Sequence, residues 1–324
     1  MKCLTKKTVR IALWLCLTGL LILFVSFIAV GFDVKKLDTV AYETNTYEID
    51  DYFSNITIKT QTADLRFVPW EEEYCKVVCY EEEKVKHTVT VQKNTLMIDV
   101  TDTRKWYDHI GMSFEDAELT VYLPKKQYEA LEVKSDTGDV ELPEDFAVKS
   151  GKVKTDTGDV TWKASVIGKF VIETDTGEVK VDTDTFEQLE IKTSTGDVSV
   201  DSVTIAYLVS VETGTGEIRL NNIKCRIFSA KTDTGEIRIK DTVAGLNGTI
   251  LSQTGDVTLE DSDAVESLYI KTDTGDVTGT LLSEKTFLTE TDTGRINVPK
   301  TTGDVECHIT TNTGDINIEV VGQK

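Results

Sequence analysis

The chain has 324 residues, of which 40% are hydrophobic and 8% aromatic, enough apolar material for a core of one or two domains. Its 35 Lys and Arg residues are outnumbered by 56 Asp and Glu residues, which gives a formal net charge of -21. Because binding to phosphates needs clustered Lys and Arg, this balance argues against nucleic acid as a partner. It also predicts an acidic surface that repels anionic polymers unless divalent cations bridge them.

The N-terminus has the pattern of a membrane anchor. An uncharged apolar run over 11–30 follows four basic residues, Lys2, Lys6, Lys7 and Arg10. Twenty helical residues span roughly 30 Å, the thickness of a bilayer core. The positive charge before the run predicts that residues 1–10 lie in the cytoplasm. We therefore expect a single-pass protein of the cell membrane, with residues 32–324 extracytoplasmic.

Two alternatives to a retained anchor stay open. Ala29-Val30-Gly31 has the small residues of a signal cleavage site, although secretory signals have a shorter apolar region of about 7–15 residues. A lipid on Cys16 is the second alternative, but Leu15 stands where a small residue is wanted.

The cysteines predict few or no disulfides. Cys75 and Cys79 lie in one strand-like run, and four residues of a strand span about 13 Å, too far for a disulfide. Cys225 and Cys307 belong to different copies of the repeat described next. The Cys75–Cys79 spacing also suits a metal pair, but no histidine or further cysteine completes a zinc set in the sequence. We expect both to pack as small hydrophobic side chains.

A short repeat fills most of the chain. The tetrapeptide Asp-Thr-Gly-Asp, or a near copy, recurs every 19 or 20 residues. A fixed short period is typical of a stacked repeat protein. The predicted turn glycines are Gly138, Gly158, Gly177, Gly196, Gly216, Gly235, Gly255, Gly275, Gly294 and Gly314.

Each copy consists of a strand, a corner and a second strand, as in VKTDTGDVTW. Apolar residues alternate on both arms, which is the period of a strand. Glycine suits the corner because it reaches positive φ at no steric cost, and the threonine before it can exchange hydroxyl hydrogen bonds between rungs. A rung this short leaves no room for a helix, so we predict a β-helix whose rungs stack about 4.8 Å apart. An array of antiparallel hairpins is the alternative.

The repeat starts earlier with a degenerate copy, Ile58 to Phe67, in which Ala63 replaces the glycine. The strand-like runs that follow predict an inserted β-meander that caps the first rungs. The C-terminus ends just past the last copy, whose edge we expect to be a pairing surface. The predicted fold is an all-β solenoid of ten or eleven rungs, with a cytoplasmic N-terminus (1–10), an anchor (11–30), a linker and cap (31–50), a degenerate rung with the meander (51–130) and regular repeats (131–324).

The segment AELTVYLPKKQYEALEVKSDTGDVEL, the N-terminal anchor and the Thr-Gly-Asp rungs resemble the bacterial putative-adhesin family, also called DUF4097. The resemblance covers about residues 37–320, and its most specific part is the strand that ends in Leu123-Pro124 before the first Ser-Asp-Thr-Gly-Asp. It implies a β-solenoid on the outer face of a Gram-positive-type membrane and brings no catalytic residues. Some members sit beside regulators of the envelope-stress response, which implies a regulatory alternative.

A column of carboxylates follows the turn glycines and is the candidate metal site. Like charges about 4.8 Å apart repel each other, and such a column could hold calcium through oxygen ligands. Nearby lysines, splayed side chains or capping of turn amides by the aspartates would explain it without a metal. The candidate calcium ligands are Asp139, Asp159, Glu178, Asp197, Glu217, Glu236, Asp256 and Asp276, with Arg295 and Asp315 at the same position in the last two copies.

Catalytic interpretations have little support in the sequence. Asp-Thr-Gly is also the signature of aspartic proteases, which need two copies facing each other, whereas here the copies follow one another along a rod. A polysaccharide-active β-helix would carry long loops, yet the rungs are nearly uniform, and His87, His109 and His308 are dispersed.

We therefore expect a non-catalytic surface binding or structural protein without a cofactor. Its expected partners are a protein or glycan at the cell surface. Two alternatives are an accessory partner of a membrane sensor or transporter in envelope-stress sensing, and a polysaccharide-active enzyme.

Overall fold

The structure, a computed structural model, describes residues 6–29, 31, 40–108, 113, 115–183 and 187–321. Lys2, Cys3 and His109 lie outside this part of the chain. The first element is α1 (Lys6–Ala29), in which side chains are described continuously over 10–26. No helix of the described residues is both long and apolar enough to cross a membrane. The transmembrane helix predicted over 11–30 is therefore not shown.

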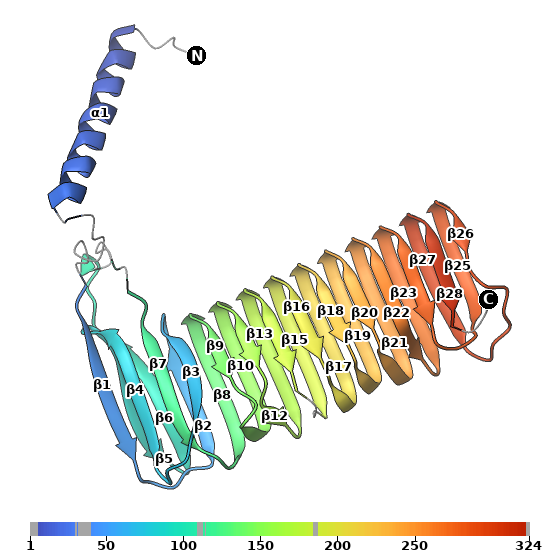
Figure 1. Ribbon diagram of the computed structural model, residues 1–324, viewed down its shortest axis with the longest axis horizontal. Helices are drawn as coiled ribbons and strands as arrows, with labels where there is room; N and C mark the ends of the chain where they lie inside the picture. The colour runs from blue at the N-terminus through green and yellow to red at the C-terminus, as the bar shows by residue number, and fades with distance from the viewer. Residues whose placement is uncertain are drawn as a thin grey trace.

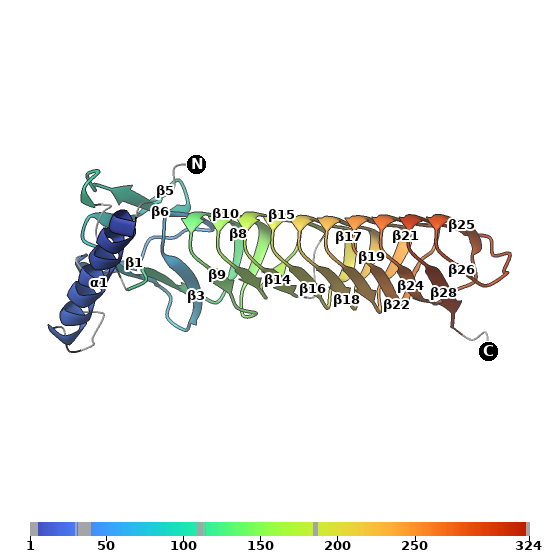
Figure 2. The same cartoon turned by 90° about the horizontal axis from the view of Figure 1, so that it is seen from above.

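The rest of the described chain forms an all-β solenoid of about nine turns, drawn out as a straight rod (Figure 1). Each turn contributes one strand to sheet B and, after the Thr-Gly corner, one strand to sheet A. Seen from above, the two sheets run along the whole length of the rod (Figure 2).

The N-terminal cap, as we name β1 to β7, contains the degenerate copy as β2 and β3. Its strands are β1 (Tyr42–Ile49), β2 (Asn55–Thr60), β3 (Asp64–Trp70), β4 (Cys75–Glu82), β5 (Val85–Gln92), β6 (Thr95–Asp102) and β7 (Glu118–Pro124).

The regular stack, β8 to β28, contains the glycine repeats. Its first half comprises β8 (Gln127–Thr137), β9 (Val140–Leu142), β10 (Ala147–Thr157), β11 (Val160–Trp162), β12 (Ser165–Val166), β13 (Lys169–Thr176), β14 (Val179–Asp182), β15 (Gln188–Thr195), β16 (Val198–Asp201), β17 (Thr204–Thr215) and β18 (Ile218–Asn221). The second half comprises β19 (Lys224–Thr234), β20 (Ile237–Lys240), β21 (Val243–Thr254), β22 (Val257–Ala264), β23 (Ser267–Thr274), β24 (Val277–Leu281), β25 (Thr286–Thr293), β26 (Ile296–Asn297), β27 (Glu306–Thr313) and β28 (Ile316–Val320).

Neighbouring strands of the stack pair in parallel, with equivalent positions of the repeat in register. In sheet B, Val153 lies between Val133 and Ile172. Because consecutive hairpin strands would pair antiparallel, the hairpin alternative is wrong and the predicted solenoid is confirmed.

Apolar side chains from both sheets fill the interior as one continuous core. Alternate residues of each strand point inward, so the strand period of the sequence becomes a buried stripe. Where large rings meet, a small residue makes room. Trp162 and Phe170 are fully buried with ring centroids 4.1 Å apart, and a Cβ on Gly151 would lie only 2.7 Å from the Phe170 ring.

The last two repeats are stacked out of chain order. β27 lies between β23 and β25, and β28 lies between β24 and β26. After β24 the chain moves to the outermost position, forms β25 and β26, and returns to insert the final repeat beneath them (Figure 1). The open edge is therefore formed by the Gly294 copy, which corrects the expectation that the last copy forms it. The count of ten or eleven rungs stays a prediction. The outer copy is short on sheet A, where β26 has only 2 residues.

The N-terminal end is also out of chain order. β2 pairs in parallel with both β6 and β8, and β3 pairs with both β7 and β9. The degenerate copy thus stacks directly on the first regular repeat. β4 then pairs antiparallel with β7 and β1, and β5 pairs antiparallel with β6, so antiparallel strands cover this end.

Candidate functional site

The corner of each repeat requires glycine for two reasons. Gly216 has a φ of +153°, a conformation that residues with a Cβ rarely adopt. A Cβ here would also overlap the carbonyl oxygen of Gly196 in the preceding rung. The other predicted turn glycines lie in the same line, each against a backbone carbonyl of its neighbouring rung, and all except Gly294 have positive φ.

The aspartates after these glycines cap backbone amides of the next rung. The Asp159 amide donates to Asp139 Oδ1 at 2.8 Å, and Asp159 Oδ1 in turn accepts from the Glu178 amide at 2.7 Å. Five more rungs form the same amide-to-carboxylate bond, at 2.7–3.0 Å. The pairs, with the amide first, are Asp139 to Asp64, Glu217 to Asp197, Asp276 to Asp256, Asp315 to Asp276, and Arg295 to Asp315.

Glutamate occurs in this column where a basic residue follows two positions later on the same face. Glu178 pairs with Lys180 at 2.7 Å and Glu236 with Arg238 at 2.6 Å. Glu217 pairs with Arg219 and also lies 3.4 Å from Arg238. Where the column has aspartate, the residue two positions later is not basic. In this column, glutamate therefore forms an ion pair, whereas the shorter aspartate caps a backbone amide.

The carboxylate column is thus engaged with groups of the protein itself. Calcium takes about six to eight oxygen ligands, so several carboxylates must converge on one point. Within the described ranges, no three carboxylates of the column bring ligand oxygens within 4.8 Å of one another. The arrangement favours amide capping over calcium binding as the role of these residues.

The hydroxyl that bonds between rungs belongs to a different threonine from the one we expected. The threonine next to each glycine is exposed, whereas the residue three positions before the glycine is buried in every copy except that of Gly294, where Thr291 is half-buried. Thr213 Oγ1 donates to Gly196 O at 3.1 Å, and Thr232 Oγ1 donates to Gly216 O at 3.2 Å. This buried hydroxyl ties sheet B to the corner of the preceding rung.

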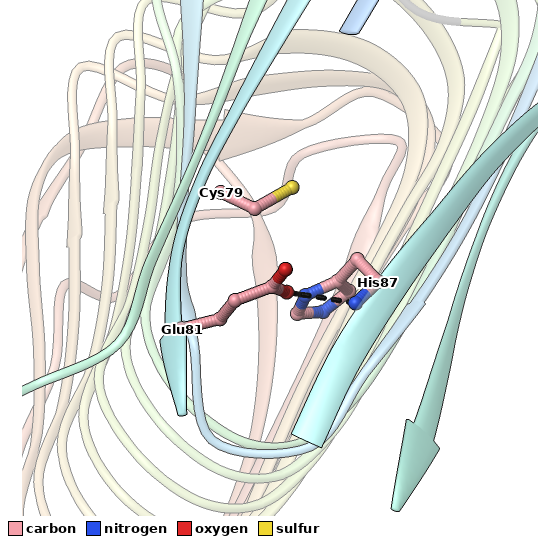
Figure 3. Close-up of side chains that lie close together, drawn as sticks. All are labelled: Cys79, Glu81 and His87. Carbon is pink, nitrogen blue, oxygen red and sulfur yellow. Dashed lines mark hydrogen bonds and ion pairs between the residues drawn. The ribbon is translucent and has the colours of Figure 1, made fainter. Parts of the chain in front are cut away.

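A second polar group lies inside the N-terminal cap, where Cys79 and Glu81 on β4 meet His87 on β5 (Figure 3). All three side chains are buried. Glu81 Oε2 accepts hydrogen bonds from the His87 backbone amide at 2.7 Å and from His87 Nδ1 at 2.6 Å. Glu81 Oε1 accepts from Asn45 Nδ2 at 2.8 Å, and His87 Nε2 lies 3.0 Å from Thr60 Oγ1.

The chain path explains this meeting. β4 belongs to sheet A and β5 to sheet B, so the short turn after Glu82 carries the chain across the core. The alternation of strand residues points Cys79, Glu81 and His87 inward. No fixed motif spacing encodes this crossing, so the sequence pattern gave no sign that a histidine lies beside the cysteines. Cys75 is buried on the same face but is not part of the group.

Electrostatics favours a polar network here rather than a metal centre. Burial, with a smaller contribution from Glu81, raises the pKa of the Cys79 thiol to about 12. Burial by itself raises the pKa of Glu81, but the hydrogen bonds from His87 and Asn45 outweigh it and hold that pKa below its usual value. A Cys-Glu-His set can bind zinc, yet an ion here would have to displace these hydrogen bonds and deprotonate Cys79.

The other described cysteines are free thiols as well. Cys225 and Cys307 are buried, and burial raises the pKa of each thiol to about 12. Such thiols are inert packing groups rather than nucleophiles.

Solved structures resemble the chain at low identity. A putative adhesin from Bacteroides fragilis is 15% identical, with 86% of this chain and 97% of that one covered and a TM-score of 0.35. A putative lipid binding protein from Parabacteroides distasonis is 17% identical, with 87% and 98% covered and a TM-score of 0.42. A putative adhesin from the same organism is 10% identical, with 86% and 98% covered and a TM-score of 0.45. No curated protein matches the chain.

The model of the Toastrack DUF4097 family matches residues 53–223 and 207–324, which together include the N-terminal cap from β2 onward and the whole regular stack. The resemblance seen in the sequence is thereby confirmed: this chain belongs to the Toastrack DUF4097 family.

Proposed function

We propose that the protein is a non-catalytic solenoid that presents a long regular surface outside the cell, as a binding or structural element. The observation that carries the proposal is the use of its reactive groups. The carboxylates of the corner column cap amides or form ion pairs, and the Cys79, Glu81 and His87 group is buried and hydrogen-bonded. Enzyme sites instead gather titratable groups in an open pocket.

The surface hollow on sheet A is in keeping with this proposal. A cavity of about 330 Å³ lies on its outer face, with Arg219, Arg238 and Lys240 among its lining residues. Each of these cations is paired with a glutamate, so the hollow is lined by compensated charges. Such a lining is suited to contact with a polar protein or glycan surface.

A depolymerisation screen tests the non-catalytic part of the proposal. The purified chain from residue 40 onward is incubated with plant and cell-wall glycans, and reducing ends are measured. We expect no more reducing ends than in buffer, and release by this chain that is lost on denaturation would overturn the proposal.

We also propose that residues 11–30 hold the protein in a membrane, with the solenoid outside. Support comes from the uncharged run within α1, whose large apolar side chains are exposed, from 50% at Leu17 to 68% at Trp14. Exposed apolar helix surface of this kind is stable in lipid. Protease added to intact cells should remove a C-terminal tag, and a tag that is cleaved only after lysis would contradict this orientation.

A regulatory role is the second candidate, because the three most exposed Trp and Tyr residues of the described β-structure lie outside the regular repeats. Tyr52 is 76% exposed, Trp106 is 78% exposed, and Tyr107 is also exposed, all in the N-terminal cap or its connections. Exposed Trp and Tyr are enriched where proteins bind partners.

Site-specific photo-crosslinking separates the two candidates. A photoreactive residue replaces Trp106 in one variant and Lys192, an exposed residue of the regular stack, in the matched variant. Capture of a membrane sensor or transporter from Trp106 alone would support regulation. Capture of surface polymers from Lys192 would support the binding or structural role.

A further inference from the structure

A buried ion pair lies at the C-terminal end of the solenoid. Lys285 Nζ lies 2.6 Å from Asp263 Oδ1, with side-chain exposures of 1% and 8%. In the part of the chain that the structure describes, Lys285 is the only buried lysine. The exposed pair Lys240–Glu260, at 3.1 Å with exposures of 57% and 58%, shows the usual setting of such contacts in this protein.

We propose that Lys285 and Asp263 are the site of an intramolecular isopeptide bond, an amide between Nζ and Cγ. The groups around the carboxylate suit this condensation. The Ala264 amide donates to Asp263 Oδ1 at 2.8 Å and polarises the oxygen that would become the amide carbonyl. Ser283 Oγ donates to Asp263 Oδ2 at 2.6 Å, which puts a proton relay beside the oxygen that would leave. The Ala264 carbonyl accepts from Lys285 Nζ at 2.7 Å and holds the amine in place.

The bond forms without an oxidant or a co-reactant. A proton passes from the Lys285 ammonium to Asp263 Oδ1, which leaves a neutral amine and a neutral acid. The nitrogen lone pair attacks Cγ and forms a tetrahedral intermediate. A second proton from nitrogen and the proton on Oδ1 then reach Oδ2, with Ser283 as the relay. The C–Oδ2 bond breaks, the Cγ=Oδ1 double bond forms again, and Oδ2 leaves as one molecule of water. One hydrogen stays on the amide nitrogen.

Burial drives the pair toward this product. Two charges held out of water carry a desolvation cost that their attraction offsets only in part, whereas an amide is neutral. Fixed contact between the reacting groups replaces a bimolecular encounter. Low exposure of both side chains also limits the access of water that would reverse the reaction.

The position of the pair indicates which part of the solenoid the bond would stabilise. Asp263 is near the end of β22, and Lys285 directly precedes β25, the outermost strand of sheet B. The bond would close a loop around β23 and β24 and fasten the outer rung to the stack. This is the place where the chain leaves its sequential order, so a covalent link here would hold the open end against unravelling.

The test is the intact mass of the full chain after denaturation, with tandem mass spectrometry of its peptides. We expect the wild-type protein to lack the mass of one water molecule, and a branched peptide to join Lys285 to Asp263. Lys240 and Glu260, in the same digest, should stay unlinked. A wild-type mass equal to that of the sequence would overturn the proposal.

Two variants exclude other sources of water loss. Lys285→Arg keeps the charge but cannot form this amide, so it should regain the full mass, and circular dichroism reports whether it is folded. Ser283→Ala should reduce the linked fraction through a rate about a hundredfold lower. Water loss that persists in Lys285→Arg would place the modification at another residue and overturn the assignment.

Discussion

The N-terminal end of the solenoid is closed, whereas the C-terminal end is open. Antiparallel strands cover the first rungs, and apolar residues there are buried: Phe53 is 3% exposed and Val85 is 6% exposed. At the other end, Leu288 is 43% exposed and Ile296 is 45% exposed, and β25 and β26 have a stack neighbour on one side only. A solenoid grows by adding rungs to an edge, so a closed edge and an open edge offer different surfaces to partners.

The two ends nevertheless share one feature that the middle lacks. Among the described residues, the buried ionisable groups other than thiols and Tyr128 are Glu81 and His87 at one end, and Asp263 and Lys285 at the other. Both groups lie where strands stack out of chain order. Apolar rungs fit one another almost interchangeably, but a buried polar group is stable only with its own partners. We infer that these groups select the order of rungs at the ends.

The largest effect should come from the corner glycines. In Gly216→Ala, alanine would have to adopt a positive φ, and its Cβ would overlap the Gly196 carbonyl oxygen. We therefore expect a loss of about 3 kcal/mol or more in the free energy of unfolding. Gly245→Ala, where the nearest atom to a Cβ is 3.7 Å away, is the matched control and should stay within about 1 kcal/mol. Urea unfolding measures both.

The same substitution at the open edge tests whether the end of the rod is as firmly held as the middle. Gly294→Ala also meets a backbone carbonyl, that of Gly314, but the outer rung can move away. We expect it to raise hydrogen exchange in β25 and β26 alone. Equal destabilisation of the whole rod by Gly216→Ala and Gly294→Ala would show that the end is as firmly held as the middle.

Glu81→Gln tests the buried group at the closed end. The amide would place a donor against the hydrogen-bond donors of His87 or Asn45, and we expect a loss of about 2 kcal/mol at neutral pH. The pKa of Glu81 is held below its usual value in the folded state. Its contribution to stability is therefore present above the unfolded pKa of about 4.3 and is lost as the pH falls through the lower folded value.

The pH dependence provides the check. The difference in unfolding free energy between wild type and Glu81→Gln should shrink as the pH falls below about 4. Asn45, Cys79 and His87 surround the carboxylate, so His87→Gln, measured over the same range, separates the loss of the carboxylate charge from the loss of its hydrogen bond with the imidazole. A difference that is constant with pH would contradict the assigned role of Glu81.

A smaller effect is expected at the amide caps. Asp159→Ala removes the acceptor of the Glu178 amide and should cost about 1 kcal/mol. Asp156→Ala, at an exposed corner position of the same rung, should be nearly neutral. Thermal unfolding of the two variants compares them directly, and equal melting temperatures would show that the cap contributes nothing.

Calcium should have the smallest effect. Because the column carboxylates cap amides or form ion pairs, we expect neither millimolar calcium nor a chelator to shift the unfolding midpoint. A calcium-dependent rise in the midpoint that is lost in Asp159→Ala would restore the metal interpretation of the column.

Some features of the candidate site could be predicted from the sequence. The turn glycines mark the corners because their period is that of the rungs and they suit positive φ, and the alternation of valine and isoleucine marks the core. The roles of the polar residues could not be decided from the sequence. Aspartate and glutamate look equivalent in the column, and the difference between a cap and an ion pair depends on the amide of the next rung. His87 and Cys79 meet only because a turn crosses the core.

The sequence by itself determined an all-β stack of rungs, since 19 or 20 residues with two alternating arms and a corner glycine leave no room for a helix. The parallel pairing that excludes hairpins was visible only in the structure. Only the tertiary structure decided the order of the end rungs. Near-identical repeats have near-identical edges, so no local signal distinguishes β25 from β27 as the neighbour of β23. That choice depends on contacts between residues distant in the chain, such as Asp263 with Lys285 and Glu81 with Asn45.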